Sequence, residues 1–307
     1  MIIIADDLCH VYNNRTPHSR TALSGISLEI AGGSCAAIVG VTGSGKSTLV
    51  QHFNGLLWPT SGTLSVNGLR IGDSRPSRNQ LTALRRQVGL LFQFPESQLF
   101  APTIFDDIAF GPRQLNLTDT QIHDRVTHAL RSVALDDSSG FWKRSPFELS
   151  GGQKRRVAIA GVLAMRPTVL ILDEPSAGLD AEARDELYVQ LARLQHEEGL
   201  TIIIVSHDMT EVAALADTVF VLHEGRVKLS GRPEDVFRRS EELKACGLIP
   251  PPLVQLAGAV TAKGGLLAEG VVSVETVSRA MIQLWRTAVD GEHAGMSGER
   301  ELRSHVE

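Results

Sequence analysis

Residues 40–47 read GVTGSGKS, and the residue types in this pattern suit the binding of a nucleoside triphosphate. Its glycines let successive backbone N–H groups turn inward around a phosphate, and a helix that begins where the loop ends aims its positive end at the same anion. Lys46 is placed to contact the β- and γ-phosphate oxygens, and Ser47 is placed to bind Mg²⁺. The predicted phosphate site comprises Gly40, Val41, Thr42, Gly43, Ser44, Gly45, Lys46, Ser47 and Thr48.

Two adjacent carboxylates follow the apolar run at residues 169–172 and add the chemistry of hydrolysis. Asp173 stands where the run ends, a position from which it can bind Mg²⁺ directly or through water. Glu174 comes next, and a carboxylate close to the γ-phosphate can orient and polarise the attacking water as a general base. The sequence therefore predicts an ATPase that works with Mg²⁺.

Three short apolar runs, at 36–39, 169–172 and 202–205, predict the strands that position these residues. Continuous hydrophobic strands suit a parallel sheet covered by helices on both faces. Each run ends in polar residues, and ligands of open α/β sheets lie at the carboxyl ends of the strands, so we expect all three to border one site. Alternating residues in 1–35 predict a small antiparallel sheet. We expect helices over about 95–160, with an approach helix containing Leu81, Leu84 and Val88 just before them.

The composition is that of an ordinary globular protein with enough apolar residues for a large core: 307 residues, 43% hydrophobic and 21% charged. A net charge of -5 argues against a dedicated nucleic-acid binder. The three cysteines lack the spacing of a disulfide or metal framework. The apolar stretch at the start of the chain is too short for a signal peptide, because acidic residues follow at positions 6 and 7. No apolar stretch reaches the roughly 18 residues that cross a bilayer. Membrane association is therefore expected only through partners.

The pentapeptide at 149–153, LSGGQ, resembles the signature of ABC-type ATPases, and matching motifs cover nearly all of residues 1–235. The resemblance implies a P-loop NTPase (RecA-like) α/β core with a small antiparallel β subdomain, an ABC helical subdomain and a short C-terminal helical extension. It implies that Tyr12 stacks on adenine, that Gln93 senses Mg²⁺ and the transport subunit, and that His207 contacts the γ-phosphate. Residues 176–180, ending in Asp180, resemble the loop that signals between the two sites of a dimer. The signature residues that would close on the γ-phosphate of a neighbouring chain are Ser150, Gly151, Gly152 and Gln153.

Residues 92–100, FQFPESQLF, resemble the segment after the Gln loop in ATPases of energy-coupling factor (ECF) importers, which take up vitamins and transition-metal ions. The resemblance implies a groove that receives a transmembrane coupling subunit, in which Glu96 pairs with an arginine of that subunit. Pro95, Gln98 and Phe100 would complete the groove. The region after Pro250 resembles the helical extension through which paired ECF ATPases hold each other. The implied domains are an ATPase at 1–235, an extension at 236–289 and a disordered tail at 290–307.

These motifs together predict the ATP-hydrolysing subunit of an ECF importer, at the cytoplasmic face of the membrane. It would form a head-to-tail dimer with an identical or paralogous ATPase, coupled to a transmembrane subunit and substrate-specific membrane components. An ordinary binding-protein-dependent importer is the first alternative, disfavoured by residues 94–100 and by the short extension. A soluble ABC protein acting on nucleic acid or ribosomes is the second, disfavoured by a single cassette without a long coiled-coil insertion. The sequence does not name the transported substrate.

Overall fold

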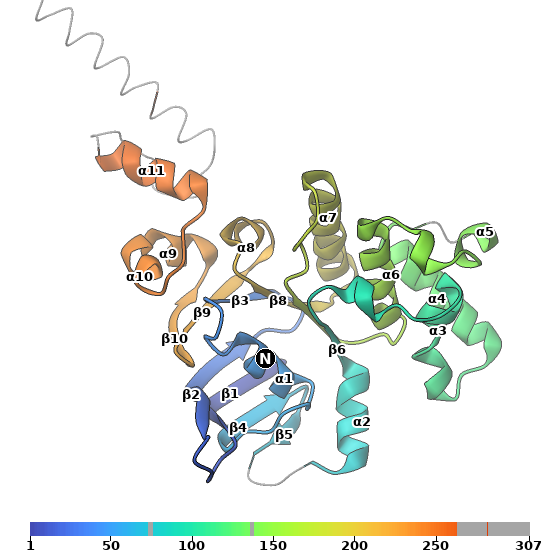
Figure 1. Ribbon diagram of the computed structural model, residues 1–307, viewed down its shortest axis with the longest axis horizontal. Helices are drawn as coiled ribbons and strands as arrows, with labels where there is room; N and C mark the ends of the chain where they lie inside the picture. Colours follow the sequence, from blue (N-terminus) through green and yellow to red (C-terminus); the bar gives the residue numbers. More distant parts are fainter. Residues whose placement is uncertain (73–75, 136–137, 263–280, 282–307) are drawn as a thin grey trace, which may run out of the picture.

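The computed structural model describes residues 1–72, 76–135, 138–262 and 281. A six-stranded sheet lies at its centre, in the order β10-β9-β3-β8-β7-β6 (Figure 1). All neighbours pair in parallel except β10 and β9, which pair antiparallel. The strands are β3 (Cys35–Val39), β6 (Val88–Leu91), β7 (Val169–Asp173), β8 (Thr201–Ser206), β9 (Thr218–His223) and β10 (Arg226–Gly231). β3 and β8 are buried at every residue, as expected for strands covered on both faces.

A second sheet of four antiparallel strands lies beside the first, in the order β2-β1-β4-β5. Its strands are β1 (Ile3–Tyr12), β2 (Arg20–Ile30), β4 (Ser61–Val66) and β5 (Leu69–Ile71). Buried and exposed residues alternate along most of β2, so the sheet turns one face to the core and one to solvent. Helix α1 (Lys46–Phe53) packs its apolar face into a core shared with both sheets. The antiparallel sheet expected from residues 1–35 is confirmed, and it extends to Ile71.

The residues between β6 and β7 form a mainly helical region that packs on the other side of the parallel sheet (Figure 1). It consists of η1 (Pro95–Gln98), α3 (Ile104–Ala109), η2 (Pro112–Leu115), α4 (Asp119–Ser132), α5 (Ser139–Trp142), η3 (Pro146–Glu148) and α6 (Gly151–Leu163). The approach helix is α2 (Arg78–Gln87), which is shorter than expected. Val88 belongs to β6 instead, because its backbone is extended and pairs with Val169 of β7.

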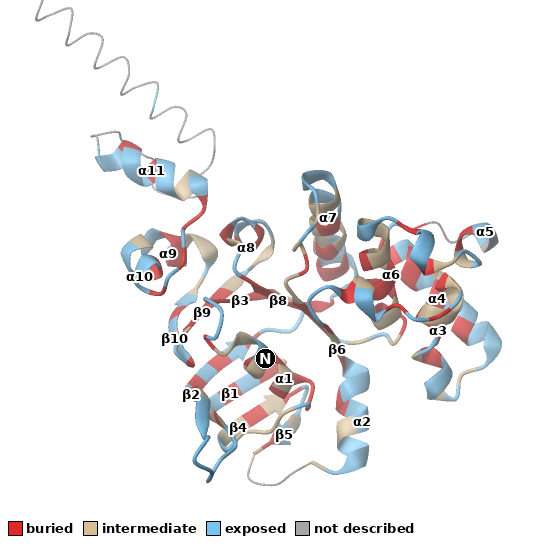
Figure 2. Cartoon of the chain, viewed as in Figure 1, coloured by how far each residue is buried: buried red, intermediate tan, exposed pale blue. Residues whose placement is uncertain are grey.

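Five further helices complete the described chain: α7 (Ala181–Glu198), α8 (Met209–Leu215), α9 (Pro233–Arg238), α10 (Ser240–Ala245) and α11 (Pro252–Ala262). Buried residues lie along the parallel sheet and on the inner faces of the helices around it (Figure 2). Of the two helices expected over 254–288, α11 covers the start, and the remainder lies outside the described residues except for Met281. The expected tail at 290–307 lies outside them as well. Among the described helices, none combines the length and apolar character needed to cross a bilayer.

Candidate nucleotide site

The loop between β3 and α1 has a backbone that needs glycine. Gly40, Gly43 and Gly45 have φ angles of 157°, 84° and 107°, a region that side chains with a Cβ atom rarely adopt. A Cβ atom at Gly40 would lie 2.3 Å from the carbonyl oxygen of Leu222, and one at Gly45 would lie 2.7 Å from that of Ala22. The loop is therefore held close to neighbouring backbone, and α1 begins at Lys46 with its N–H groups facing the loop. This geometry provides a phosphate cradle at a helix N-terminus.

Lys46 and the hydroxyl group of Ser47 lie close to the carboxylate of Asp173. Lys46 Nζ donates to the carbonyl oxygens of Gly40 at 2.6 Å and Val41 at 3.1 Å, so the ammonium group lies inside the loop. Burial lowers the pKa of Lys46, against the opposing effect of Glu174 and Asp173. Ser47 Oγ donates to Asp173 Oδ2 at 3.4 Å. The structure thus brings together the loop and the end of β7, as the strand argument predicted.

The residues predicted to hold Mg²⁺ fit such an ion by their chemistry. Ser47 and Asp173 offer oxygen ligands, which Mg²⁺ prefers. Burial raises the pKa of Asp173, Glu174 raises it further, and Ser47 and Lys46 oppose the shift. A buried carboxylate beside a second carboxylate is stabilised by a cation, so the surroundings of Asp173 suit a divalent ion.

Glu174 and His207 lie in direct contact at the ends of β7 and β8. His207 Nδ1 donates to Glu174 Oε1 at 2.7 Å, while the Glu174 side chain is 14% exposed and that of His207 is 70% exposed. This bond places a proton on Nδ1, so Nε2 can donate to a bound phosphate only when the ring carries its second proton. Glu174 has a φ of 52°, a left-handed backbone that is strained for a residue other than glycine. Its N–H donates to the carbonyl oxygen of Val205 at 2.8 Å, which holds it beside β8.

A cavity of about 370 Å³ joins the loop, the carboxylates and the predicted adenine side chain. Tyr12, Gln93 and His207 line it, and the Tyr12 hydroxyl lies 3.1 Å from Thr48 Oγ1. Its remaining predicted lining residues are Thr42, Gly43, Gly45, Lys46, Ser47, Thr48, Asp173 and Glu174. Gly40, Val41 and Ser44 do not line it; Gly40 and Ser44 lie in the turn behind, where Ser44 is only 2% exposed. The cavity is large enough for a nucleotide, and its polar lining matches a triphosphate.

Sequence reasoning missed Arg20, Thr21 and Ala22 at the start of β2, which line the same cavity. They reach it because β2 pairs with β1, where Tyr12 lies opposite Arg20. Only the register of the antiparallel pair places them there. No pattern in the sequence itself gave that register.

Ser150, Gly151 and Gly152 of the signature lie apart from this cavity and line a second hollow, whereas Gln153 lines neither of the two. Ser150 caps α6, with its hydroxyl accepting from the Gln153 N–H at 3.3 Å and its own N–H donating to Gln153 Oε1 at 3.2 Å. Gly151, Gly152 and Asp180 line the hollow of about 320 Å³ beside them. Of the described residues, none lines both hollows. One chain therefore carries a phosphate cradle and a separate small-residue helix start that also exposes N–H groups.

Two of the four residues predicted for the partner groove line one hollow. Gln98 and Phe100 line a hollow of about 420 Å³ together with residues from β6, α3 and α6. Phe100 is 60% exposed, and its ring packs edge-to-face on that of Phe110, with 5.0 Å between centroids. Pro95 is buried instead, because η1 turns it inward. Glu96 does not line the hollow either, since its carboxylate pairs with Arg155 of the same chain.

The chain matches the pattern of the ABC transporter family over residues 23–177. It is 45% identical to the energy-coupling factor transporter ATP-binding protein EcfA2 of Clostridium tetani, a match that covers 93% of this chain and 98% of the relative. It is 47% identical to the protein of the same name from Symbiobacterium thermophilum, over 92% of this chain and 96% of the relative.

Solved structures agree with these sequence relatives. CbiO1 from Clostridium perfringens, part of the ABC transporter complex CbiONQ, has a TM-score of 0.71 and 39% identity, covering 84% of this chain and 98% of its own. A dimeric post-hydrolysis state of the ATP-binding cassette MJ0796 bound to ADP and Pi has a TM-score of 0.65 and 26% identity. That match covers 75% of this chain and 98% of the cassette.

Proposed function

We infer that this chain, which belongs to the ABC transporter family and within it to the ATP-binding proteins of energy-coupling factor transporters, powers an importer as one half of an ATP-driven clamp. Its work would be to bind ATP between two ATPase subunits and to hydrolyse it at the cytoplasmic face of the membrane. The observation that carries this proposal is the separation of the two hollows, one around Lys46 and one around Gly151. Each offers one side of a phosphate site, so a complete site needs a second chain.

In the proposed dimer, the phosphate loop of one chain faces the signature of the other. Lys46 and the loop N–H groups hold the β- and γ-phosphates, and the N–H groups at the start of α6 of the second chain approach the γ-phosphate from the opposite side. The related cassette MJ0796 forms a dimer in its post-hydrolysis state, which supports this arrangement. Closure then depends on ATP because the γ-phosphate bridges the two chains.

Hydrolysis is assigned to Glu174 as the general base. Its carboxylate accepts a proton from the attacking water, and His207 holds that carboxylate through the 2.7 Å bond to Oε1. When doubly protonated, His207 would also donate from Nε2 to the γ-phosphate. Gln93 lies on the wall of the same cavity, at the junction with the helical region. Mg²⁺ bound by Ser47 and Asp173 would neutralise charge on the phosphate oxygens. Tyr12 provides the aromatic face for adenine.

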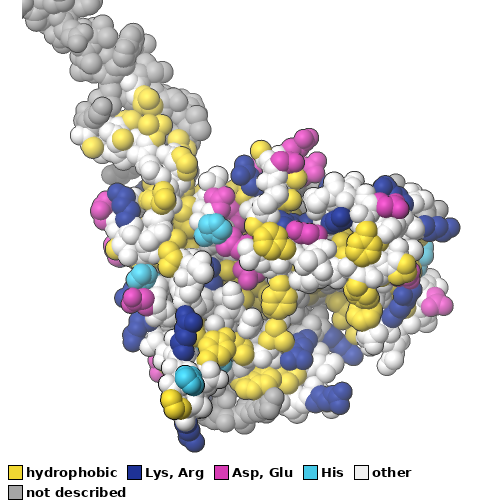
Figure 3. Space-filling model, in the orientation of Figure 1, with side chains coloured by type: hydrophobic (Ala, Val, Ile, Leu, Met, Phe, Trp, Pro, Cys, Tyr) yellow, Lys and Arg dark blue, Asp and Glu magenta, His cyan; other side chains and the backbone are white. Residues whose placement is uncertain are grey.

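Two surfaces of the chain suit the proposed partners. The hollow around Gln98 and Phe100 exposes aromatic side chains next to η1, and it suits a coupling helix of a membrane subunit. Hydrophobic side chains are also exposed over α11 (Figure 3), where Leu256 is 41% exposed, and Ile249 just before the helix is 73% exposed. We assign α11 to the contact between the two ATPase subunits. The relative CbiO1 is part of the complex CbiONQ, which supports a membrane-bound assembly.

Affinity purification from detergent-solubilised membranes tests this proposal. We expect the chain to recover a second ATPase, identical or paralogous, a common transmembrane subunit, and one or more small membrane proteins that select the substrate. Recovery of a single dedicated membrane partner would favour an ordinary importer. Recovery of ribosomes or nucleic-acid-bound proteins, with no membrane protein, would contradict transport altogether.

A further inference from the structure

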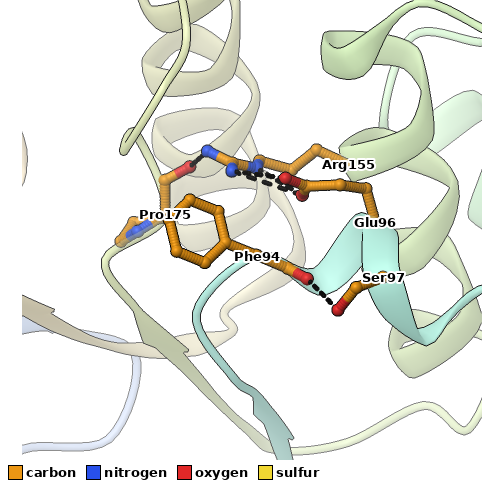
Figure 4. Close-up of polar contacts among 5 residues, drawn as sticks. All are labelled: Phe94, Glu96, Ser97, Arg155 and Pro175. Carbon is orange, nitrogen blue, oxygen red and sulfur yellow. Dashed lines mark hydrogen bonds and ion pairs between the residues drawn. The ribbon is translucent and has the colours of Figure 1, made fainter.

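Arg155 is a buried arginine that joins two loops of the candidate site. It lies on α6, five positions after Ser150, and its side chain is 3% exposed. Nη1 donates to the carbonyl oxygen of Pro175 at 2.6 Å. Nε and Nη2 face the carboxylate of Glu96 at 3.3–3.4 Å. Figure 4 shows the guanidinium group between the two loops, with Glu96 on the turn of η1 and Pro175 on the opposite side.

Each loop that Arg155 holds contains a strained backbone position. Pro175 directly follows Glu174, whose φ is 52°, and Glu96 lies two residues after Phe94, whose φ is 54°. Such conformations persist only where surrounding contacts determine them. On the η1 side, Ser97 donates to the carbonyl oxygen of Phe94 through its N–H at 3.0 Å and its hydroxyl at 2.8 Å. On the Glu174 side, the bond from Arg155 holds the carbonyl group of Pro175, the residue that follows the general base.

We propose that Arg155 is a positioning residue that links the partner groove to the general base. It holds the Pro175 carbonyl, and with it the left-handed turn at Glu174, at a fixed position relative to Glu96 of η1, the short helix that also carries Gln98 of the groove. The inference deepens the proposed function and rests on it, since it takes Glu174 as the base and η1 as the segment that a membrane subunit contacts. Arginine suits the task because its rigid planar group donates from separate nitrogens in fixed directions, to Pro175 on one side and Glu96 on the other, whereas an ammonium group is a compact charge without that fixed geometry.

The two contacts of Arg155 differ in strength and exposure, and the contact with Glu96 is the weaker one. The bond to Pro175 is short at 2.6 Å and buried, whereas the contacts with Glu96 are long, and the Glu96 side chain is 28% exposed. Glu96 is therefore the end that a cationic group of the membrane subunit can reach. Such a cation competes with Arg155 for the carboxylate, and the guanidinium then shifts on its remaining anchor at Pro175. Engagement of the groove would thus change the position of Glu174.

Steady-state ATP hydrolysis by the purified transporter complex tests the link. In Arg155→Gln we expect kcat to fall about 10²-fold, since a displacement of about 1 Å at a catalytic group costs about that much. KM for ATP should stay within about twofold, because Lys46 and the loop that bind the phosphates are not changed. Arg125→Gln is the matched control: Arg125 donates to the carbonyl oxygens of Ala164 and Met165 at the other end of α6, at 3.2 and 3.3 Å. Its kcat should stay within about twofold.

A second variant separates positioning from simple loss of stability. Removing one partner of a buried ion pair is strongly destabilising, whereas replacing both with apolar residues of similar volume is often neutral. Arg155→Met combined with Glu96→Met should therefore recover the melting temperature lost in Arg155→Gln. We expect kcat to remain at least tenfold below wild type in this double variant and in Arg155→Lys. Recovery of kcat to within threefold of wild type in the double variant would overturn the proposal and leave Arg155 a purely structural residue.

The same preparation distinguishes this inference from the proposed function beneath it. If Glu174→Gln hydrolyses ATP at the wild-type rate, the assignment of the general base fails, and the link fails with it. If Glu174→Gln is inactive while Arg155→Gln keeps a kcat within twofold of wild type, only the link is rejected. Loss of kcat in both variants, with ATP binding retained, supports both.

Discussion

Replacing Glu174 by Gln converts the carboxylate that acts as the proposed general base into a neutral amide. The amide keeps the shape of the side chain, and its oxygen can still accept from His207 Nδ1, the contact that measures 2.7 Å in the structure. The variant therefore removes the proton acceptor while it preserves the position of His207. General-base catalysis contributes about 10²–10⁴-fold, which corresponds to about 3–5 kcal/mol of activation free energy. We expect kcat to fall by that factor.

The assay is steady-state phosphate release by the purified complex, together with ATP binding measured on the same samples. Binding of ATP should change by less than about threefold, since Lys46 and the phosphate loop are intact. Glu197→Gln is the control: this carboxylate pairs with Arg193 at 2.8 Å on the exposed side of α7, and its loss should leave kcat unchanged. Wild-type hydrolysis by Glu174→Gln would refute the reasoning, as would an equal loss in Glu197→Gln.

Three further outcomes follow from the structure. Tyr12→Ala should weaken ATP binding by about 1–3 kcal/mol, with Tyr12→Phe close to wild type; equal affinities in calorimetry would contradict stacking. Burial lowers the pKa of His52 to about 4, so wild type should lose about 2 kcal/mol of unfolding free energy between pH 6.5 and 5, and His52→Phe should lose less. Burial raises the pKa of Glu211 to about 7, so wild-type stability should fall by about 3 kcal/mol from pH 5 to 8. In Glu211→Gln the fall over the same range should be smaller, and denaturant titrations across pH check both stability predictions.

The signs of the two pH effects differ because the groups carry opposite charge types. Neutral His52 is favoured in the folded state, so the unfolded chain takes up the extra proton as pH falls from 6.5 towards 4. Protonated Glu211 is favoured in the folded state, because its carboxyl group is fully buried. The side chains of Ser206 and Ser176 act in the opposite direction and lower the pKa of Glu211. Equal pH slopes for each variant and wild type would contradict these assignments.

The parts of the site that lie within one strand–loop–helix unit could be predicted from the sequence. The glycines of residues 40–47 indicate a backbone conformation that Cβ atoms would block. The apolar run before Asp173 indicates a buried strand that ends in a residue able to bind Mg²⁺. Both signals are local, because spacing along the chain determines the geometry. The parallel sheet places the ends of β3, β7 and β8 together, so the shared site followed from the strand type alone.

The parts that depend on contacts across the fold could not be predicted in this way. Arg20 reaches the cavity through the register of β2 on β1, and Arg155 reaches Glu96 through the packing of α6 on η1. The resemblance of residues 92–100 led us to expect that Glu96 pairs with an arginine of the transmembrane subunit, whereas within this chain its carboxylate contacts the buried Arg155. The left-handed turn at Glu174 had no glycine to reveal it. Each of these features follows from tertiary packing rather than from spacing.

The central claim is that one chain supplies two different half-sites to two ATP molecules, and ATP-dependent association tests it most directly. Sedimentation velocity of Glu174→Gln, alone and with the ATPase that copurifies with it, should show a dimer in ATP with Mg²⁺ but not in ADP. Adding Gly151→Asp, which places a carboxylate at the signature, should abolish that dimer while ATP binding to the single chain persists. A monomer in every condition, or a dimer that survives Gly151→Asp, would contradict the account.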